Sequence, residues 1–208
     1  MGQIIGTLIG LTALGALGGI AFVYSGAYNI GADEPHWSMT YRVMETVRVR
    51  SIKAHAANIA VPANLGDQDR ILAGAVHFAT HCAICHSAPG VKASDLAEGM
   101  YPKPPELTHV PGMWAPGELF WIVKHGIKMS GMPSWADHGD DQLWNSVAFL
   151  QKLPTLTPDS YKQLLESAKA KGIGHEMSDM QMQKPANSPN RATKPSDPST
   201  TTMPGMKH

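Results

Sequence analysis

The sequence has very little cysteine: Cys82 and Cys85 are the only two in a chain of 208 residues. Without a second pair, the chain cannot build a four-thiolate zinc site or a framework of several disulfides. The formal net charge is zero, from 17 basic and 17 acidic side chains, so we expect no nucleic-acid partner. Aromatic residues make up only 7% of the chain, which is little for a large core. We therefore expect a bound group to supply part of the apolar interior.

The two cysteines lie in the stretch Cys82-Ala83-Ile84-Cys85-His86, which is the attachment pattern of a c-type haem. Two thiols at this spacing can reach the two vinyl groups of one porphyrin, and the following imidazole can reach the iron. A Cys-x-x-Cys pair alone would also fit a redox dithiol, half a zinc site or a disulfide. His86 favours haem, and no strand-rich pattern nearby suggests a thioredoxin fold. We therefore predict one covalent haem c, attached through both cysteines and ligated by His86.

A sixth iron ligand is predicted downstream, in a segment over 126–135 that is too rich in glycine and proline to be helical. Met132 is favoured as the ligand because of its neighbours. Gly131, just before it, can adopt backbone conformations that other residues disfavour, and Pro133, just after it, has a fixed φ. A thioether suits low-spin haem iron and raises its reduction potential. Met129 is the alternative thioether ligand. Met100 and Met113 are expected in core packing, and His109, His125 and His138 are the candidates for bis-histidine ligation.

The region from about Asp69 to Pro154 resembles a class I cytochrome c domain. Gly74, Phe78 and Cys82 have the spacing of that family's N-terminal helix, and Val147-Ala148-Phe149-Leu150 resembles its C-terminal helix. The resemblance implies that these helices cross at the glycine and that the Pro105 carbonyl holds the imidazole of His86. Ser146 departs from the family, which usually has an aliphatic residue there, so we expect looser packing at the crossing. The implied fold class is all-α.

The first 32 residues contain no charged side chain, and the apolar run over 4–28 would form a helix of about 37 Å. That length can cross a bilayer, so we predict a transmembrane anchor over 1–32. A cleaved signal peptide is the alternative, but the apolar run is too long for one and no basic segment precedes it. The basic residues after the anchor would place the domain in the cytoplasm. Haem attachment to Cys-x-x-Cys-His, however, takes place outside the bacterial inner membrane. We give this more weight than the basic residues and expect the domain on the outer side.

Four further segments are predicted along the chain. A juxtamembrane helix and linker cover 33–68, with the helix either on lipid head groups or packed on the haem domain or a partner. The cytochrome domain covers 69–154, and a C-terminal helix covers 155–172. The remainder, 173–208, contains five prolines, eight serines or threonines and no Phe, Tyr or Trp, so we predict disorder. Its methionines and histidines could bind Cu(I), although a solvated tail with incidental methionines is the simpler interpretation.

These features favour a membrane-tethered monohaem cytochrome over an enzyme. A haem with both axial positions filled exchanges electrons and leaves no place for a substrate. The expected partners are the lipid bilayer and a membrane-bound oxidase, quinol-oxidising complex or dehydrogenase, with the protein as carrier or subunit. The expected location is the bacterial inner membrane, single-pass, with the haem domain and C-terminus in the periplasm. The main alternative is a gas or redox sensor in which Met132 leaves the iron, and a peroxidase-type haem ranks below it.

Overall fold

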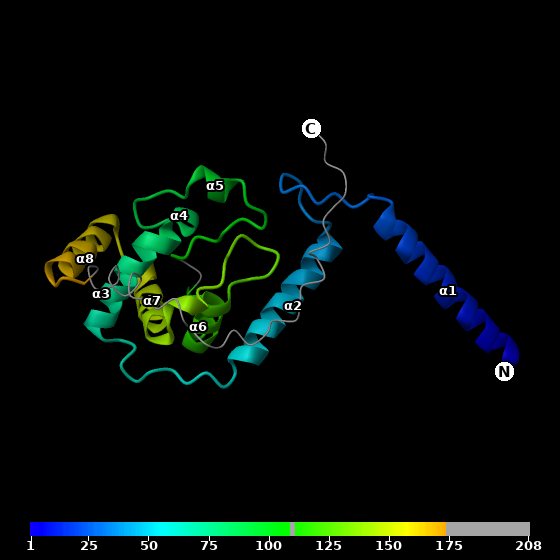
Figure 1. Cartoon of the computed structure of the whole chain (residues 1–208), viewed down its shortest axis with the longest axis horizontal. Coiled ribbons are helices and arrows are strands. Elements are labelled where there is room, and N and C mark those ends of the chain that lie inside the picture. Colours follow the sequence, from blue (N-terminus) through cyan, green and yellow to red (C-terminus); the bar gives the residue numbers. More distant parts are fainter. Residues whose placement is uncertain (109–110, 174–208) are drawn as a thin grey trace, which may run out of the picture.

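A computed structural model of the chain describes residues 1–108 and 111–173, and within them the fold is helical (Figure 1). Across these described ranges the only β pairing is an isolated bridge between Ala88 and Val91, so the predicted all-α fold class is confirmed. The α-helices are Gly2–Tyr24 (α1), Ser38–Ala56 (α2), Gln68–His77 (α3), Ala83–His86 (α4), Asp95–Glu98 (α5), Pro116–His125 (α6), Asp140–Lys152 (α7) and Pro158–Ala170 (α8). Four short turns complete them: a π turn Phe78–Cys82 (η1) and the 3-10 turns Pro111–Met113 (η2), Ala136–His138 (η3) and Leu153–Thr155 (η4).

The centre of the domain is the crossing of α3 and α7, which the resemblance predicts. A Cβ built on Gly74 would overlap the carbonyl of Asn145 and lie 2.8 Å from Cβ of Phe149. Only glycine therefore lets the two backbones approach this closely. Phe78, one turn further along, packs its ring 5.1 Å from that of Phe149, and both side chains are fully buried.

Two more helices close the core on either side of this crossing. On α6, Leu119, Phe120 and Val123 are buried, and the Phe120 ring stacks on Trp144 of α7 at 4.2 Å. On α8, Tyr161 is buried and its ring lies 6.0 Å from that of Phe149. Helix α8 begins with a side-chain cap, since Thr157 Oγ1 accepts a hydrogen bond from the backbone N–H of Ser160.

Helix α2 packs on the haem domain, which decides between the alternatives that the sequence leaves open. Ile52 and Ala56 are its buried residues, and the end of α2 approaches α6 at Gly117. The guanidinium of Arg48 also lies over the ring of Trp114 at 5.9 Å. The outward side of α2 stays exposed, including Met39, Val43 and Val47.

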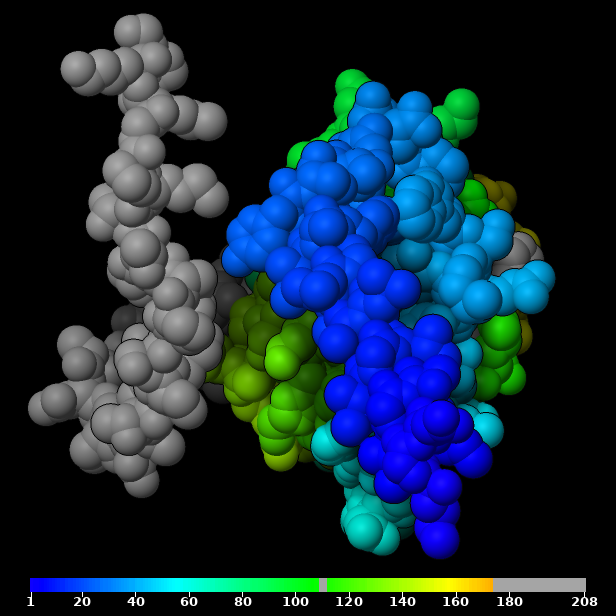
Figure 2. Space-filling view, turned by 90° about the vertical axis from the view of Figure 1, so that its right-hand side faces the viewer, coloured from blue at the N-terminus to red at the C-terminus, as the bar shows by residue number. Residues whose placement is uncertain are grey.

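Helix α1 extends away from the domain and buries none of its residues (Figure 1). The segment 25–37 then turns back to α2, so that this segment and α1 share one side of the molecule (Figure 2). Tyr28 Oη bonds His36 Nδ1 at 2.8 Å, and the backbone N–H of His36 donates to Tyr101 Oη at 3.1 Å. The bond to Tyr101 attaches the connecting segment to the domain.

Candidate haem site

The attachment motif forms a short helical turn whose histidine is held from behind. Cys85 and His86 lie in α4, and Cys82 ends the π turn that leads into it. The Nδ1–H of His86 donates to the carbonyl oxygen of Pro105 at 2.9 Å. Because a carbonyl can only accept, Nδ1 carries the proton and Nε2 keeps its lone pair for a metal. This is the contact that the family resemblance implies.

The loop after α4 returns to the motif and fixes it. Both the backbone N–H and the hydroxyl of Ser94 donate to the carbonyl of Ile84, at 3.1 and 2.8 Å. Burial lowers the pKa of His86, and its hydrogen bond to Pro105 acts in the opposite direction. The imidazole is therefore neutral at neutral pH, the form that binds a metal.

The two cysteines lack the character of a redox dithiol. Both are free thiols with half-buried side chains. Burial raises the pKa of Cys82 to about 12, with a smaller contribution from Cys85. Reactive Cys-x-x-Cys pairs instead have a thiol whose pKa is lowered. The environment of Cys82 thus fits thioether attachment better than thiol exchange.

Backbone hydrogen bonds hold Met132 in a defined loop after α6. Its N–H donates to Ser130 Oγ at 3.2 Å, and its carbonyl accepts from the N–H of Ile127 at 3.2 Å. Gly126 ends α6 with φ of +65°, where a Cβ would overlap the returning backbone of Met132 and Pro133. The side chain of Met132 is half-buried.

The other three methionines of the domain lie in different environments. Met129 has φ of +58° and a side chain that is 77% exposed, so it points to solvent. Met113 is 78% exposed, which makes its predicted place in the core wrong. Met100 is half-buried and lies against Gly131, where a Cβ would be 2.6 Å from its sulfur. Sequence reasoning missed this thioether beside the Met132 loop because no local pattern links residues 100 and 131.

The histidines proposed for bis-histidine ligation lie in other environments. His125 is exposed at the end of α6, with its ring 5.0 Å from that of Trp121. His138 hydrogen-bonds His77 at 2.9 Å. His109 and the predicted Cu(I) site of the tail lie outside the described residues.

The residues at this site suit a haem c. Two thiols and an imidazole whose Nε2 is available are the donors that covalent attachment and one axial bond require, and the Met132 loop offers a thioether. Such donors, in a helical domain whose helices α3 and α7 cross at a glycine, are typical of the class of c-type cytochromes.

Comparison with protein families supports the same class. Residues 69–150 match the family model described as "Cytochrome C oxidase, cbb3-type, subunit III". This segment contains the attachment motif and most of α7, so it is a c-type cytochrome domain, as the resemblance predicts. The match covers less than half of the chain. Comparison with curated proteins and with solved structures gave no match. A cytochrome c domain is an electron-transfer module, and the match supports haem c as the cofactor of this segment.

Proposed function

We propose that this protein is a membrane-tethered monohaem cytochrome c that passes single electrons to or from a membrane-bound respiratory or dehydrogenase complex. The observation that carries the proposal is the hydrogen bond between His86 and Pro105, since it prepares one imidazole nitrogen for iron. When bound, the haem supplies one-electron redox chemistry. A complex of the oxidase kind is favoured by the matched family description.

In this proposal each site residue has one role. Cys82 and Cys85 form the two thioether bonds, and His86 is the proximal ligand, oriented by Pro105. Met132 is the distal ligand, and Met129 is the alternative. Two observations support Met132 over Met129 as the ligand. Hydrogen bonds on both sides of Met132 hold its backbone in position, whereas the side chain of Met129 is exposed to solvent.

The proposed tether is α1. It is 23 residues long with a mean hydropathy of 2.0 over its most apolar window, so its length and composition suit one membrane crossing. We propose that the haem domain and C-terminus lie in the periplasm of a bacterium, because covalent haem attachment takes place there. We further propose the segment boundaries 1–32, 33–68, 69–154, 155–172 and 173–208 given above.

The cofactor is tested first by expression of the full chain with a haem-attachment system. We expect a red protein whose mass exceeds the polypeptide mass by one haem, and loss of normal haem binding in His86→Ala. A colourless protein, or one of unmodified mass, would contradict the proposed function.

The distal ligand is tested with three single variants. Met132→Leu should remove the weak far-red band that the ferric protein shows when a thioether ligates the iron, whereas Met129→Leu and Met100→Leu should retain it. If Met129→Leu or Met100→Leu removes the band and Met132→Leu does not, the ligand assignment is wrong. The ferrous protein should not bind CO, and a clear CO spectrum would favour the sensor alternative.

The tether and the partner are tested together in native membranes. We expect the protein to resist extraction by alkaline carbonate. A variant in which a cleavable export signal replaces residues 1–24 should be recovered as a soluble haem protein. Purification of the full chain in mild detergent should retain a membrane redox complex. Recovery of the full chain in the soluble fraction would contradict the tether without affecting the haem site.

A further inference from the structure

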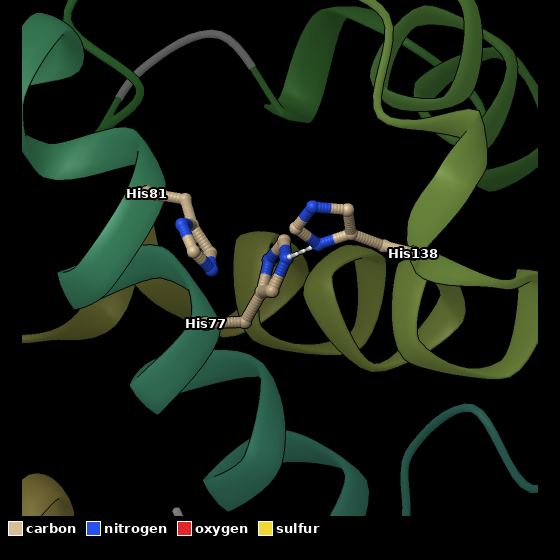
Figure 3. A group of neighbouring side chains, drawn as sticks. All are labelled: His77, His81 and His138. Atoms are coloured by element: carbon tan, nitrogen blue, oxygen red, sulfur yellow. Dashed lines mark hydrogen bonds between the residues drawn. The ribbon is translucent and has the colours of Figure 1, made fainter. Parts of the chain in front are cut away.

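We propose that His77, His81 and His138 form a binding site for a divalent transition-metal ion of the Zn²⁺ type, separate from the haem site. One nitrogen of each imidazole lies within 4.8 Å of those of the other two. Figure 3 shows the three rings turned toward one another, two from the end of the first domain helix and one from the loop before α7. Within the part of the chain that the structure describes, this is the only group of three or more such side chains.

The local backbone brings the first two ligands together. His77 and His81 are four residues apart, which places them on the same face of a helix. The chain changes from α to π winding between them, at η1, and their rings lie 4.6 Å apart. π turns of this kind occur often at functional sites.

The third ligand closes the site from the opposite side. His138 lies in η3, and its Nδ1 is 2.9 Å from His77 Nε2. Three nitrogens on a tetrahedral zinc ion lie about 3.4 Å apart, given bonds of about 2.0–2.1 Å. The spacing of 2.9 Å between His77 and His138 is shorter than this value, and the other two spacings are at most 4.8 Å, so side-chain rotations would bring the three nitrogens to the required distance. Because His77 Nε2 accepts, neutral His138 carries its single proton on Nδ1; to bind the ion through Nδ1, His138 would shift that proton to Nε2 through solvent, with no net change in charge.

His77 is also held in the orientation that a ligand requires. The hydroxyl of Ser146 donates to the carbonyl of Gln142 at 3.2 Å, so its oxygen accepts from the Nδ1–H of His77 at 2.9 Å. The remaining nitrogen, Nε2, then carries a lone pair directed at the other two histidines. Metal-ligating histidines usually have an outer hydrogen bond of this kind, which fixes tautomer and ring direction.

The charge state and the accessibility of the cluster fit metal binding. Burial, followed by His81 and His138, lowers the pKa of His77 to about 3. Burial and His138 also lower the pKa of His81. Both rings are neutral at neutral pH, so an ion competes with few protons. His81 and His138 are half-buried, which lets solvent reach the site and supply a fourth ligand.

The proposal is tested by titrating the full-length haem protein in detergent with ZnCl₂ in a calorimeter, after treatment with a chelator. We expect one ion per chain at this site. His81→Gln and His138→Gln should each weaken binding by about tenfold or more, since even outer-shell changes cost that much. The matched control is His125→Gln, an exposed histidine beside an aromatic ring, which should bind as the unaltered protein does.

Circular dichroism and the haem spectrum of each variant show whether it is folded. Because His77 is buried, the test relies on His81 and His138, whose side chains reach the surface. The histidines and methionines of the tail are present in every variant, so they cannot produce a difference among them. Equal Zn²⁺ affinity in His81→Gln, His138→Gln and the unaltered protein would overturn the proposal, as would a failure to bind Zn²⁺. Neither result would affect the haem site.

Discussion

Ser146 shows how far residue-level reasoning reaches in this sequence. The resemblance singles out Ser146 as a polar residue at the helix crossing and predicts looser packing. In the structure its side chain is buried, 3% exposed, and bonded to the buried imidazole of His77. The two residues are 69 positions apart, so no local pattern reveals their pairing. The Cys-x-x-Cys-His motif was predictable because its spacing alone specifies its chemistry.

Ser146→Ala should therefore destabilise the fold. The Nδ1–H of His77 would lose its acceptor inside the protein, which costs about 1–3 kcal/mol. The measurement is urea unfolding followed by circular dichroism. Ser167→Ala is the matched control, because Ser167 is exposed and bonds only the carbonyl of Gln163 in its own helix. Its free energy of unfolding should change by less than about 0.5 kcal/mol. Equal losses in the two variants would contradict the role given to Ser146.

At the scale of elements, the helices with strong local signals were predicted well. Proline suits the first turn of a helix and glycine its end, and α6 begins at Pro116 and ends before Gly126. The sequence also favours a helix end near Pro154, and α7 ends at Lys152. The sequence favours one continuous helix from Gln68 to His81, whereas the chain changes to a π turn at Phe78. The contact of α2 with α6 could not be predicted, since the apolar pattern of α2 is weak and the contact depends on tertiary structure.

The crossing of α3 and α7 depends on Gly74, and Gly74→Ala should disrupt it. The added methyl group would overlap the backbone of Asn145, which cannot rotate away as a side chain can. We expect a loss of about 3 kcal/mol or more in the free energy of unfolding, the upper end for overpacked contacts. Urea unfolding measures it. Gly66→Ala is the control, because nothing lies within 4 Å of a Cβ there. A Gly74→Ala variant as stable as the control would show that the helices separate easily.

The docking of α8 gives a prediction about alkaline pH. Burial raises the pKa of Tyr161 above its usual value of 10.0, and this cause remains when Cys82 is bound as a thioether. Above pH 10 the unfolded chain therefore loses this proton while the folded protein keeps it, so stability falls as pH rises. Tyr161→Phe should remove that contribution. Between neutral and alkaline pH, the unfolding free energy of this variant should therefore fall less than that of the unaltered protein. Unfolding curves at neutral and alkaline pH measure the difference, and an unchanged alkaline loss would contradict the assignment.

For the whole molecule, the connection between α1 and the haem domain was the least predictable feature. The sequence indicates an apolar helix and a linker, but the linker is attached to the domain by side chains far apart in sequence. His36 and Tyr101 are 65 positions apart, and their rings also meet edge to face at 5.0 Å. Polar contacts of this kind leave no periodic pattern in either segment.

Tyr101→Phe should loosen the connection while keeping the ring contact. The N–H of His36 would lose its acceptor, so hydrogen exchange across 25–37 should become faster. Mass spectrometry of the exchanged full-length protein measures this. Tyr41→Phe serves as control, because Tyr41 is half exposed on the outward side of α2. Exchange in 25–37 that is equally slow in both variants would contradict a stabilising role for the Tyr101 hydroxyl.

The attachment of residues 25–37 to Tyr101 has a kinetic consequence if α1 spans a bilayer. A freely jointed linker would let the redox centre sample a wide hemisphere above its anchor point. With the segment attached at Tyr101, the centre would sample a narrower range of heights and tilts, so encounters would arise mainly from lateral diffusion of two proteins in one plane. Turnover would then follow the surface density of the partner, and lengthening the segment with glycine and serine would slow electron exchange instead of accelerating it.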